Sequence, residues 1–119
     1  MDARRQSDGT KMNVTVQDES GRVVVRMSER RLDAVIAGEF KDTVRPHVAM
    51  KGPDLVLDLA AVEFLDSSGL GAVIALKKAL PAGRRMLLRG LTPNVERVFR
   101  LTRMDQVFDI IDAEDGTGA

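Results

Sequence analysis

A nearly continuous apolar segment in the middle of the chain limits the possible folds more than any other feature of the sequence. The segment reads Asp54-Leu-Val-Leu-Asp-Leu59 and holds few residues typical of a surface, which predicts a central strand covered on both faces. A helix is expected soon after it, from about Ser67 to Leu80. Because strand–helix–strand units with short links pair their strands in parallel through a right-handed crossover, this region predicts an α/β fold.

Four further segments complete the expected sheet. Residues 12–16 alternate apolar and polar side chains and residues 23–27 are rich in valine, so the two predict an antiparallel hairpin. Residues 84–89 predict another strand. Residues 104–111 are apolar enough for a final strand or a short helix, and their periodicity leaves both open. We therefore expect a small mixed β-sheet of about 4–5 strands with helices packed against it.

Two more helices are expected beside this sheet. One begins at Asp33, whose carboxylate is expected to cap it, and has an apolar residue at every fourth position on one face. Pro46 lacks a backbone donor and should end or kink this helix near Arg45. The other helix begins at Pro93, directly after Thr92 as the capping residue.

The length of 119 residues corresponds to one domain with a single core. We expect residues 12–113 to form it and residues 1–11 and 114–119 to be flexible tails. The N-terminal residues lack the apolar stretch of a secretory signal, and no apolar run approaches the roughly 20 residues that span a bilayer. Because the chain has no cysteine, disulfides are excluded, and a cytoplasmic location without membrane insertion is expected.

The charge pattern does not favour nucleic-acid binding. Lysine and arginine together number 18, as do aspartate and glutamate, so there is no bulk attraction to phosphate. Basic residues are concentrated in 77–103, where they alternate with apolar residues, a pattern typical of solvated faces. The absence of Trp and Tyr also removes the usual stacking platforms for bases.

Groups that carry catalysis are scarce. His47 is the only histidine, so neither a catalytic triad nor a histidine metal cluster can form, and we expect it to be a surface residue. Asp58 lies inside the apolar strand and is interpreted as a structural hydrogen-bonding residue. The pair Gly69-Leu-Gly71 lacks the remaining residues of a phosphate-binding loop. An enzyme, a cofactor site and a metal site are therefore not expected.

Two adjacent serines stand where the central helix begins, in Asp66-Ser-Ser-Gly-Leu-Gly71. Spacing alone favours a structural role, in which Asp66 or Ser67 caps the helix and Gly69 allows close approach to neighbouring backbone. The same position also suits a phosphate, because the backbone N–H groups at a helix start are unpaired and the helix dipole is positive there. Phosphorylation would add about −1.5 to −2 charges to a compact surface.

These residues resemble the signature of STAS domains, and specifically that of bacterial anti-sigma factor antagonists. The resemblance rests on Val56-Leu-Asp-Leu followed by Phe64-Leu-Asp-Ser-Ser-Gly-Leu-Gly71, with weaker matches at Arg31-Leu-Asp33 and Leu91-Thr-Pro-Asn-Val-Glu-Arg-Val-Phe99. It extends from about Met12 to Ile111. The segment before Asp33 departs from the family pattern because it lacks the usual glycine.

The resemblance implies a partner-switching protein without enzymatic activity. By family analogy, Ser67 is phosphorylated by an anti-sigma factor that is itself a serine kinase, and Ser68 is the second choice. The unphosphorylated protein binds that kinase and frees a sigma factor, and a PP2C-type phosphatase restores the binding form. We expect Asp66, Ser68, Gly69 and Leu70 to shape the docking surface and Asp33 to border it.

Two alternatives remain open at this point. Some STAS domains are subunits of membrane lipid-transport complexes, although the serine pair is more typical of the kinase-regulated branch. A small-molecule or nucleotide sensor is the other alternative, for which the sequence specifies no pocket. Leu70 also has an alternative role, since it can belong to the core of the domain rather than to the docking surface.

Overall fold

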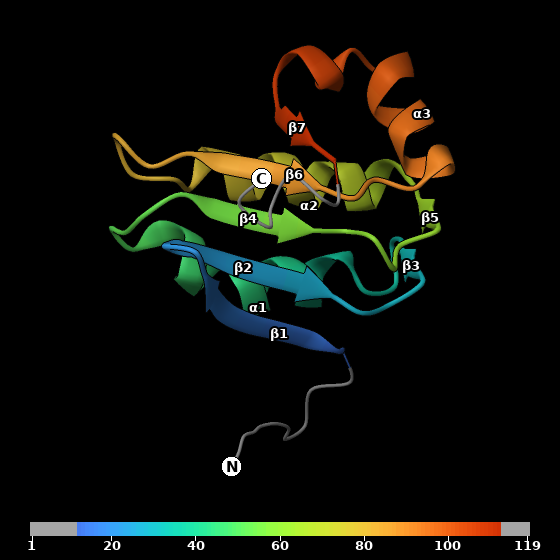
Figure 1. Ribbon diagram of the computed structural model, residues 1–119. Coiled ribbons are helices and arrows are strands. Elements are labelled where there is room, and N and C mark those ends of the chain that lie inside the picture. The colour runs from blue at the N-terminus through green and yellow to red at the C-terminus, as the bar shows by residue number, and fades with distance from the viewer. Residues whose placement is uncertain (1–11, 113–119) are drawn as a thin grey trace.

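The computed structural model describes residues 12–112 and contains a five-stranded mixed sheet (Figure 1). Its strands, in the spatial order β1-β2-β4-β6-β7, are β1 Val14–Glu19, β2 Arg22–Met27, β4 Leu55–Asp58, β6 Met86–Arg89 and β7 Asp109–Ile111. Two short strands, β3 Arg31–Leu32 and β5 Phe64–Leu65, form a second sheet. The helices are α1 Ala37–Ala49, α2 Ser67–Lys78, α3 Pro93–Leu101 and the 3-10 helix η1 Met104–Gln106.

The pairing of the strands confirms the expected α/β class. β1 and β2 form an antiparallel hairpin, whose turn residues Ser20 and Gly21 have positive φ values of 52° and 80°. β2, β4, β6 and β7 pair in parallel. Residues 104–111 contain both elements that the sequence left open, since η1 is followed by β7. The two short strands were not predicted, because a two-residue strand has no periodicity to detect.

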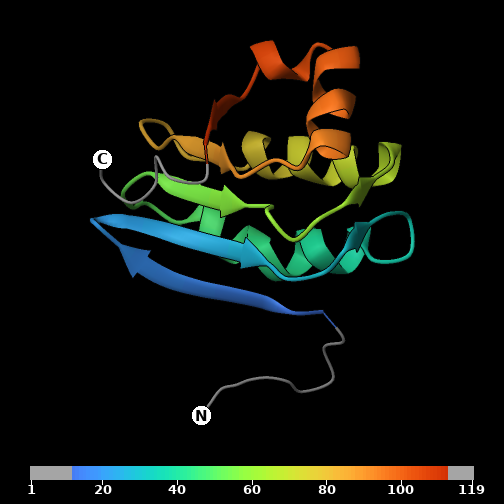
Figure 2. The same cartoon turned by 45° about the vertical axis from the view of Figure 1, so that its right-hand side comes forward.

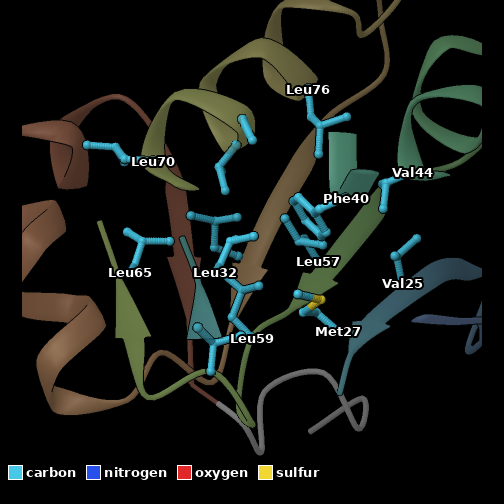
Figure 3. Packing of buried hydrophobic residues seen from close by; sticks show 14 of the residues in the cluster. Val25, Met27, Leu32, Phe40, Val44, Leu57, Leu59, Leu65, Leu70 and Leu76 are labelled. Carbon is cyan, nitrogen blue, oxygen red and sulfur yellow. The ribbon is translucent and has the colours of Figure 1, made fainter. Parts of the chain in front are cut away.

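The helices α1 and α2 lie side by side on one face of the main sheet, as Figures 1 and 2 show. The core between the sheet and these helices is filled by apolar side chains from both layers (Figure 3). Fully buried examples are Val25, Met27, Phe40, Leu57 and Leu76. A smaller apolar cluster on the other face consists of Val24, Val56 and Leu87. The central strand β4 is therefore buried on both faces, as its sequence predicts.

The predicted start of the first helix was wrong, and of the two outcomes expected at Pro46, an end or a kink, the end does not occur. The helix begins at Ala37 and not at Asp33, and it has no side-chain cap. The Asp33 carboxylate instead accepts a hydrogen bond from Val35 N at 3.1 Å, which closes a turn before the helix. At the other end the helix continues past Pro46 to Ala49. Pro46 lacks the donor for one hydrogen bond within the helix, yet the helix continues for three more residues, and its last carbonyls find partners outside it.

Those partners come from Arg84, which the sequence assigned to a solvated face. The prediction was wrong here, because Arg84 is 7% exposed. Its guanidinium donates to the carbonyl oxygens of Val48 at 3.2 Å and of Met50 at 2.8 Å, while its Nε donates to that of Pro53 at 2.7 Å. Carbonyls at a helix C-terminus lack intrahelical partners, so Arg84 satisfies the end of α1 and fixes the loop that follows.

Arg89 is the second basic residue that was wrongly assigned to a solvated face. It lies in β6 and donates to Asp58 Oδ2 in β4 through Nε at 3.1 Å and a terminal nitrogen at 2.9 Å. Asp58 therefore has the structural role expected for it. Arg26 and Glu19 extend the network, with Glu19 3.4 Å from Arg89 and 3.7 Å from Arg26. The network joins four strands of the sheet.

Candidate functional site

The candidate site lies where the two short strands β3 and β5 end. They pair in parallel, with Arg31 opposite Phe64 and Leu32 opposite Leu65, and they lie together at one end of the molecule (Figures 1 and 2). β3 leads into the turn before α1, and β5 leads directly into α2. This pairing brings together the two sequence motifs that were expected at the docking surface, although more than 30 residues separate them along the chain.

Asp66 joins the two motifs through its two carboxylate oxygens. Oδ1 accepts a hydrogen bond from Gly69 N at 2.9 Å, so Asp66 rather than Ser67 caps α2. Oδ2 accepts one from Ala34 N at 3.1 Å, in the turn before α1. One carboxylate thus satisfies a free donor at the start of α2 and positions the neighbouring turn. The cap leaves Ser67 free to serve another role.

Ser67 and Ser68 are both exposed at the first two positions of α2. The hydroxyl of Ser67 makes no hydrogen bond to any group within residues 12–112. It is therefore accessible to another protein. The backbone N–H groups of the first helical turn and the positive end of the helix dipole lie next to it, which favours an added anion.

Gly69 and Leu70 face inward. A Cβ atom on Gly69 would lie 2.1 Å from the carbonyl oxygen of Leu32, so only glycine allows α2 to approach β3 this closely. This confirms the expected close approach to neighbouring backbone. Leu70 is 8% exposed and belongs to the main hydrophobic cluster, as Figure 3 shows. Its position favours the core role that the sequence left open.

Asp33 is held by Arg31, which also covers an aromatic ring. Arg31 Nε donates to Asp33 Oδ2 at 3.1 Å, and its guanidinium carbon lies 4.4 Å from the centre of the Phe64 ring. The hydrogen bond from Arg31, followed by weaker backbone hydrogen bonds, lowers the pKa of the Asp33 carboxyl below its ordinary value of 3.8. Asp33 is therefore ionised near neutral pH.

Sequence reasoning missed two exposed apolar side chains beside the serines. Val35 is 86% exposed in the turn that Asp66 holds, and Phe64 is 42% exposed three residues before Ser67. Val35 gave no signal because an apolar residue beside an expected helix is normally assigned to the buried face. Both residues therefore lie, with their side chains open to solvent, on segments that adjoin the start of α2.

A metal-binding cluster and a membrane-spanning helix are both absent from the described part of the chain. No group of three or more His, Asp or Glu side chains within residues 12–112 is arranged to hold a metal ion. His47 is half-buried, and its backbone carbonyl accepts from Arg84, at the opposite end of α1 from the serines. Among the described helices, none has the length and apolar character needed to cross a membrane.

The chain belongs to the STAS domain family, whose model matches residues 11–116. Among solved structures it is similar to an anti-sigma factor antagonist from Mycobacterium paratuberculosis, with 32% identity, a TM-score of 0.75 and coverage of 93% of this chain and 95% of the other. It is also similar to the anti-sigma-B factor antagonist of Listeria monocytogenes, with 29% identity over 70% of this chain and 74% of the relative. The anti-sigma-B factor antagonist of Bacillus subtilis is 28% identical, over 79% of this chain and 94% of the relative.

Proposed function

We propose that this protein is an anti-sigma factor antagonist of the cytoplasm, a binding module whose partner choice is controlled by phosphorylation of Ser67. In its unphosphorylated form it binds an anti-sigma factor with serine kinase activity and so releases a sigma factor. Phosphorylation by that kinase ends the binding, and a PP2C-type phosphatase restores it. The observation that carries the proposal is the exposed Ser67 hydroxyl at the start of α2, with capping already supplied by Asp66.

The surroundings of Ser67 suit a switch that leaves the fold intact. The hydroxyl has no hydrogen-bond partner within residues 12–112 that phosphorylation would remove. The N-terminal end of α2 accommodates negative charge. A phosphate is therefore compatible with the folded domain, and its main effect falls on a partner that contacts the same surface.

The proposed docking surface consists of Ser67 and Ser68 with the exposed apolar residues Val35 and Phe64. Asp66 and Gly69 position it, since the first holds the turn that carries Val35 and the second sets the distance between α2 and β3. Asp33 borders the surface through Arg31, which lies over Phe64. Leu70 supports it from the core.

The size of the expected effect is sufficient for a switch. A charge that is buried without a partner at an interface costs several kcal/mol. A penalty of about 2.7 kcal/mol already reduces affinity a hundredfold. At a partner concentration about ten times Kd, a hundredfold loss of affinity on phosphorylation of Ser67 should reduce the bound fraction from about 90% to about 10%.

The test uses the anti-sigma factor of the source organism. Incubation with that kinase and ATP should place one phosphate on Ser67, as located by mass spectrometry of peptides. Ser67→Ala should abolish the labelling while keeping the binding, and Ser67→Asp should weaken binding about a hundredfold. Ser68→Ala is the matched control and should still be labelled. Phosphate incorporation that persists in Ser67→Ala and disappears in Ser68→Ala would move the site to Ser68.

A further inference from the structure

Two helical glycines, Gly38 in α1 and Gly71 in α2, have no conformational or steric reason to be glycine. Neither has a positive φ, and a Cβ atom at either position meets no other atom within 4 Å. Each remaining glycine in residues 12–112 has such a reason. Three have positive φ (Gly21, Gly83 and Gly90), and a Cβ on either of the other two would lie within 3.2 Å of a neighbour (Gly52 and Gly69). Glycine destabilises a helix relative to alanine, so the fold gains nothing from Gly38 or Gly71.

Both glycines line one pocket between α1 and α2. The pocket has a volume of about 190 Å³, and its walls are Ala37, Gly38, Lys41, Ser68, Gly71 and Ala72. Because the two glycine positions open to free space, each missing methyl group enlarges this pocket. Ser68, the residue after Ser67, forms part of its wall, so the pocket adjoins the proposed docking surface.

Lys41 gives the pocket a positive charge that the described residues do not neutralise. It is half-buried in α1, and it has no ion pair with any side chain in the range 12–112. The other five wall residues are uncharged. A partner that fills the pocket therefore needs a segment with small side chains, so that its backbone can come close to the glycines. It also needs an acidic side chain that pairs with the ammonium group of Lys41.

We infer that this pocket receives a segment of the anti-sigma kinase that places a carboxylate next to Lys41 while its backbone packs against Gly38 and Gly71. The inference rests on the proposed function, because it assigns a second contact to the same partner. It also accounts for glycine at two helix positions where that residue weakens the helices, because a methyl group there would prevent the close approach. The contact fixes how the kinase is oriented over Ser67.

The test measures the stability and the affinity of the same variants. Gly71→Ala should raise the melting temperature by about 2–6 °C, since it removes a helix-interior glycine, and Gly38→Ala in the first turn should raise it less. Both should weaken binding of the purified kinase, with ADP in place of ATP, by about tenfold or more, because added methyl groups overpack a close contact. Ala49→Leu, which adds bulk at the exposed far end of α1, is the control and should leave affinity unchanged.

The charge is tested separately. Lys41→Glu should weaken binding about tenfold or more at low salt, with a smaller loss at high salt, whereas Lys51→Glu in the exposed loop after α1 should have little effect. The inference is overturned if the kinase binds wild type and modifies Ser67 but binds both alanine variants equally well. A lower melting temperature for Gly71→Ala would also overturn it, because the glycine would then serve the fold. If wild type neither binds the kinase nor is modified, the proposed function itself fails.

Discussion

Two aspartates at strand ends differ in burial and in the groups that bind them. They are Asp58, at the end of β4, and Asp66, directly after β5. The side chain of Asp58 is 8% exposed and is bound by Arg89, whose own side chain is 5% exposed. Asp66 is half-exposed, and among residues 12–112 its carboxylate accepts only from the backbone N–H groups of Ala34 and Gly69. The first carboxylate neutralises a buried charge inside the domain, while the second arranges two loops around an exposed serine.

The two regions show how a small domain separates stability from recognition. The network around Asp58 joins β1, β2, β4 and β6, on the face of the sheet that carries Val24 and Val56 rather than the main core. All of its charges are matched inside the chain. The surface held by Asp66 keeps an unbonded hydroxyl and exposed apolar side chains, and we propose that these meet another protein. Substitutions in the two regions should therefore affect different properties.

The largest effect on stability is expected from Asp58→Ala. It leaves Arg89 buried with only the longer contact to Glu19, and breaking a buried ion pair in this way costs about 3–5 kcal/mol. Urea denaturation measures the loss. The double variant Asp58→Ala/Arg89→Met should regain much of it, because an apolar pair needs no charge partner. Ser67 should still be phosphorylated in the fraction of Asp58→Ala that stays folded. A loss of labelling in that folded fraction would show that the Asp58 network and the Ser67 surface are not independent.

Gly69→Ala should cost about 2–3 kcal/mol, since the new methyl group collides with the carbonyl oxygen of Leu32 and forces α2 away from β3. Gly71→Ala is an internal control two residues further along the same helix, where the methyl group meets no atom. The two alanine variants should shift the denaturation midpoint in opposite directions. Equal shifts would mean that helix propensity, and not close approach, determines both positions.

Asp66→Ala should lower the free energy of unfolding by about 1–2 kcal/mol, because α2 loses its cap. It should also weaken kinase binding, because the turn with Val35 loses its hydrogen bond to Asp66. Calorimetry and a binding titration measure the two effects. Asp42→Ala, at an exposed position of α1, should change either by little. An Asp66→Ala variant with unchanged affinity would show that the turn does not depend on this carboxylate.

The smallest effect is expected from Asp33→Asn, and it should depend on pH. The pKa of Asp33 is lowered in the folded state below 3.8, chiefly by the hydrogen bond from Arg31. A lowered pKa contributes stability that is present above the unfolded value and is lost as pH falls through the folded value. Wild type should therefore be more stable than Asp33→Asn at pH 7, and the gap should close as pH falls below 3.8. A gap independent of pH would indicate that Asp33 acts through shape alone.

The sequence was a good guide wherever neighbouring residues decide the outcome. The apolar segment around Leu57 and the serine-containing start of α2 predicted the central strand, the helix after it and the α/β class. The exposure of Ser67 was not predictable in the same way, because a serine at a helix start is either a cap or a free hydroxyl. That choice depended on Asp66, which caps the helix in its place.

The errors came from interactions between distant segments. Local rules expected α1 to end or kink near Arg45, whereas it continues to Ala49 and Arg84, 38 positions beyond Pro46, satisfies its last carbonyls. Local alternation also placed Arg89 on a solvated face, but strand order put it beside Asp58. Val35 was overlooked because its exposure depends on the turn that Asp66 holds.

The amino-acid sequence was enough to predict the order of four main strands and three α-helices, the central buried strand and the serine motif at the start of α2. Periodicity and capping act over a few residues, so they can be followed along a single chain. Long-range packing settled which charges are buried, which residue caps α2 and which apolar side chains stay exposed. Those outcomes depend on parallel pairing of β3 with β5 and of β4 with β6, which brings together residues about 30 positions apart.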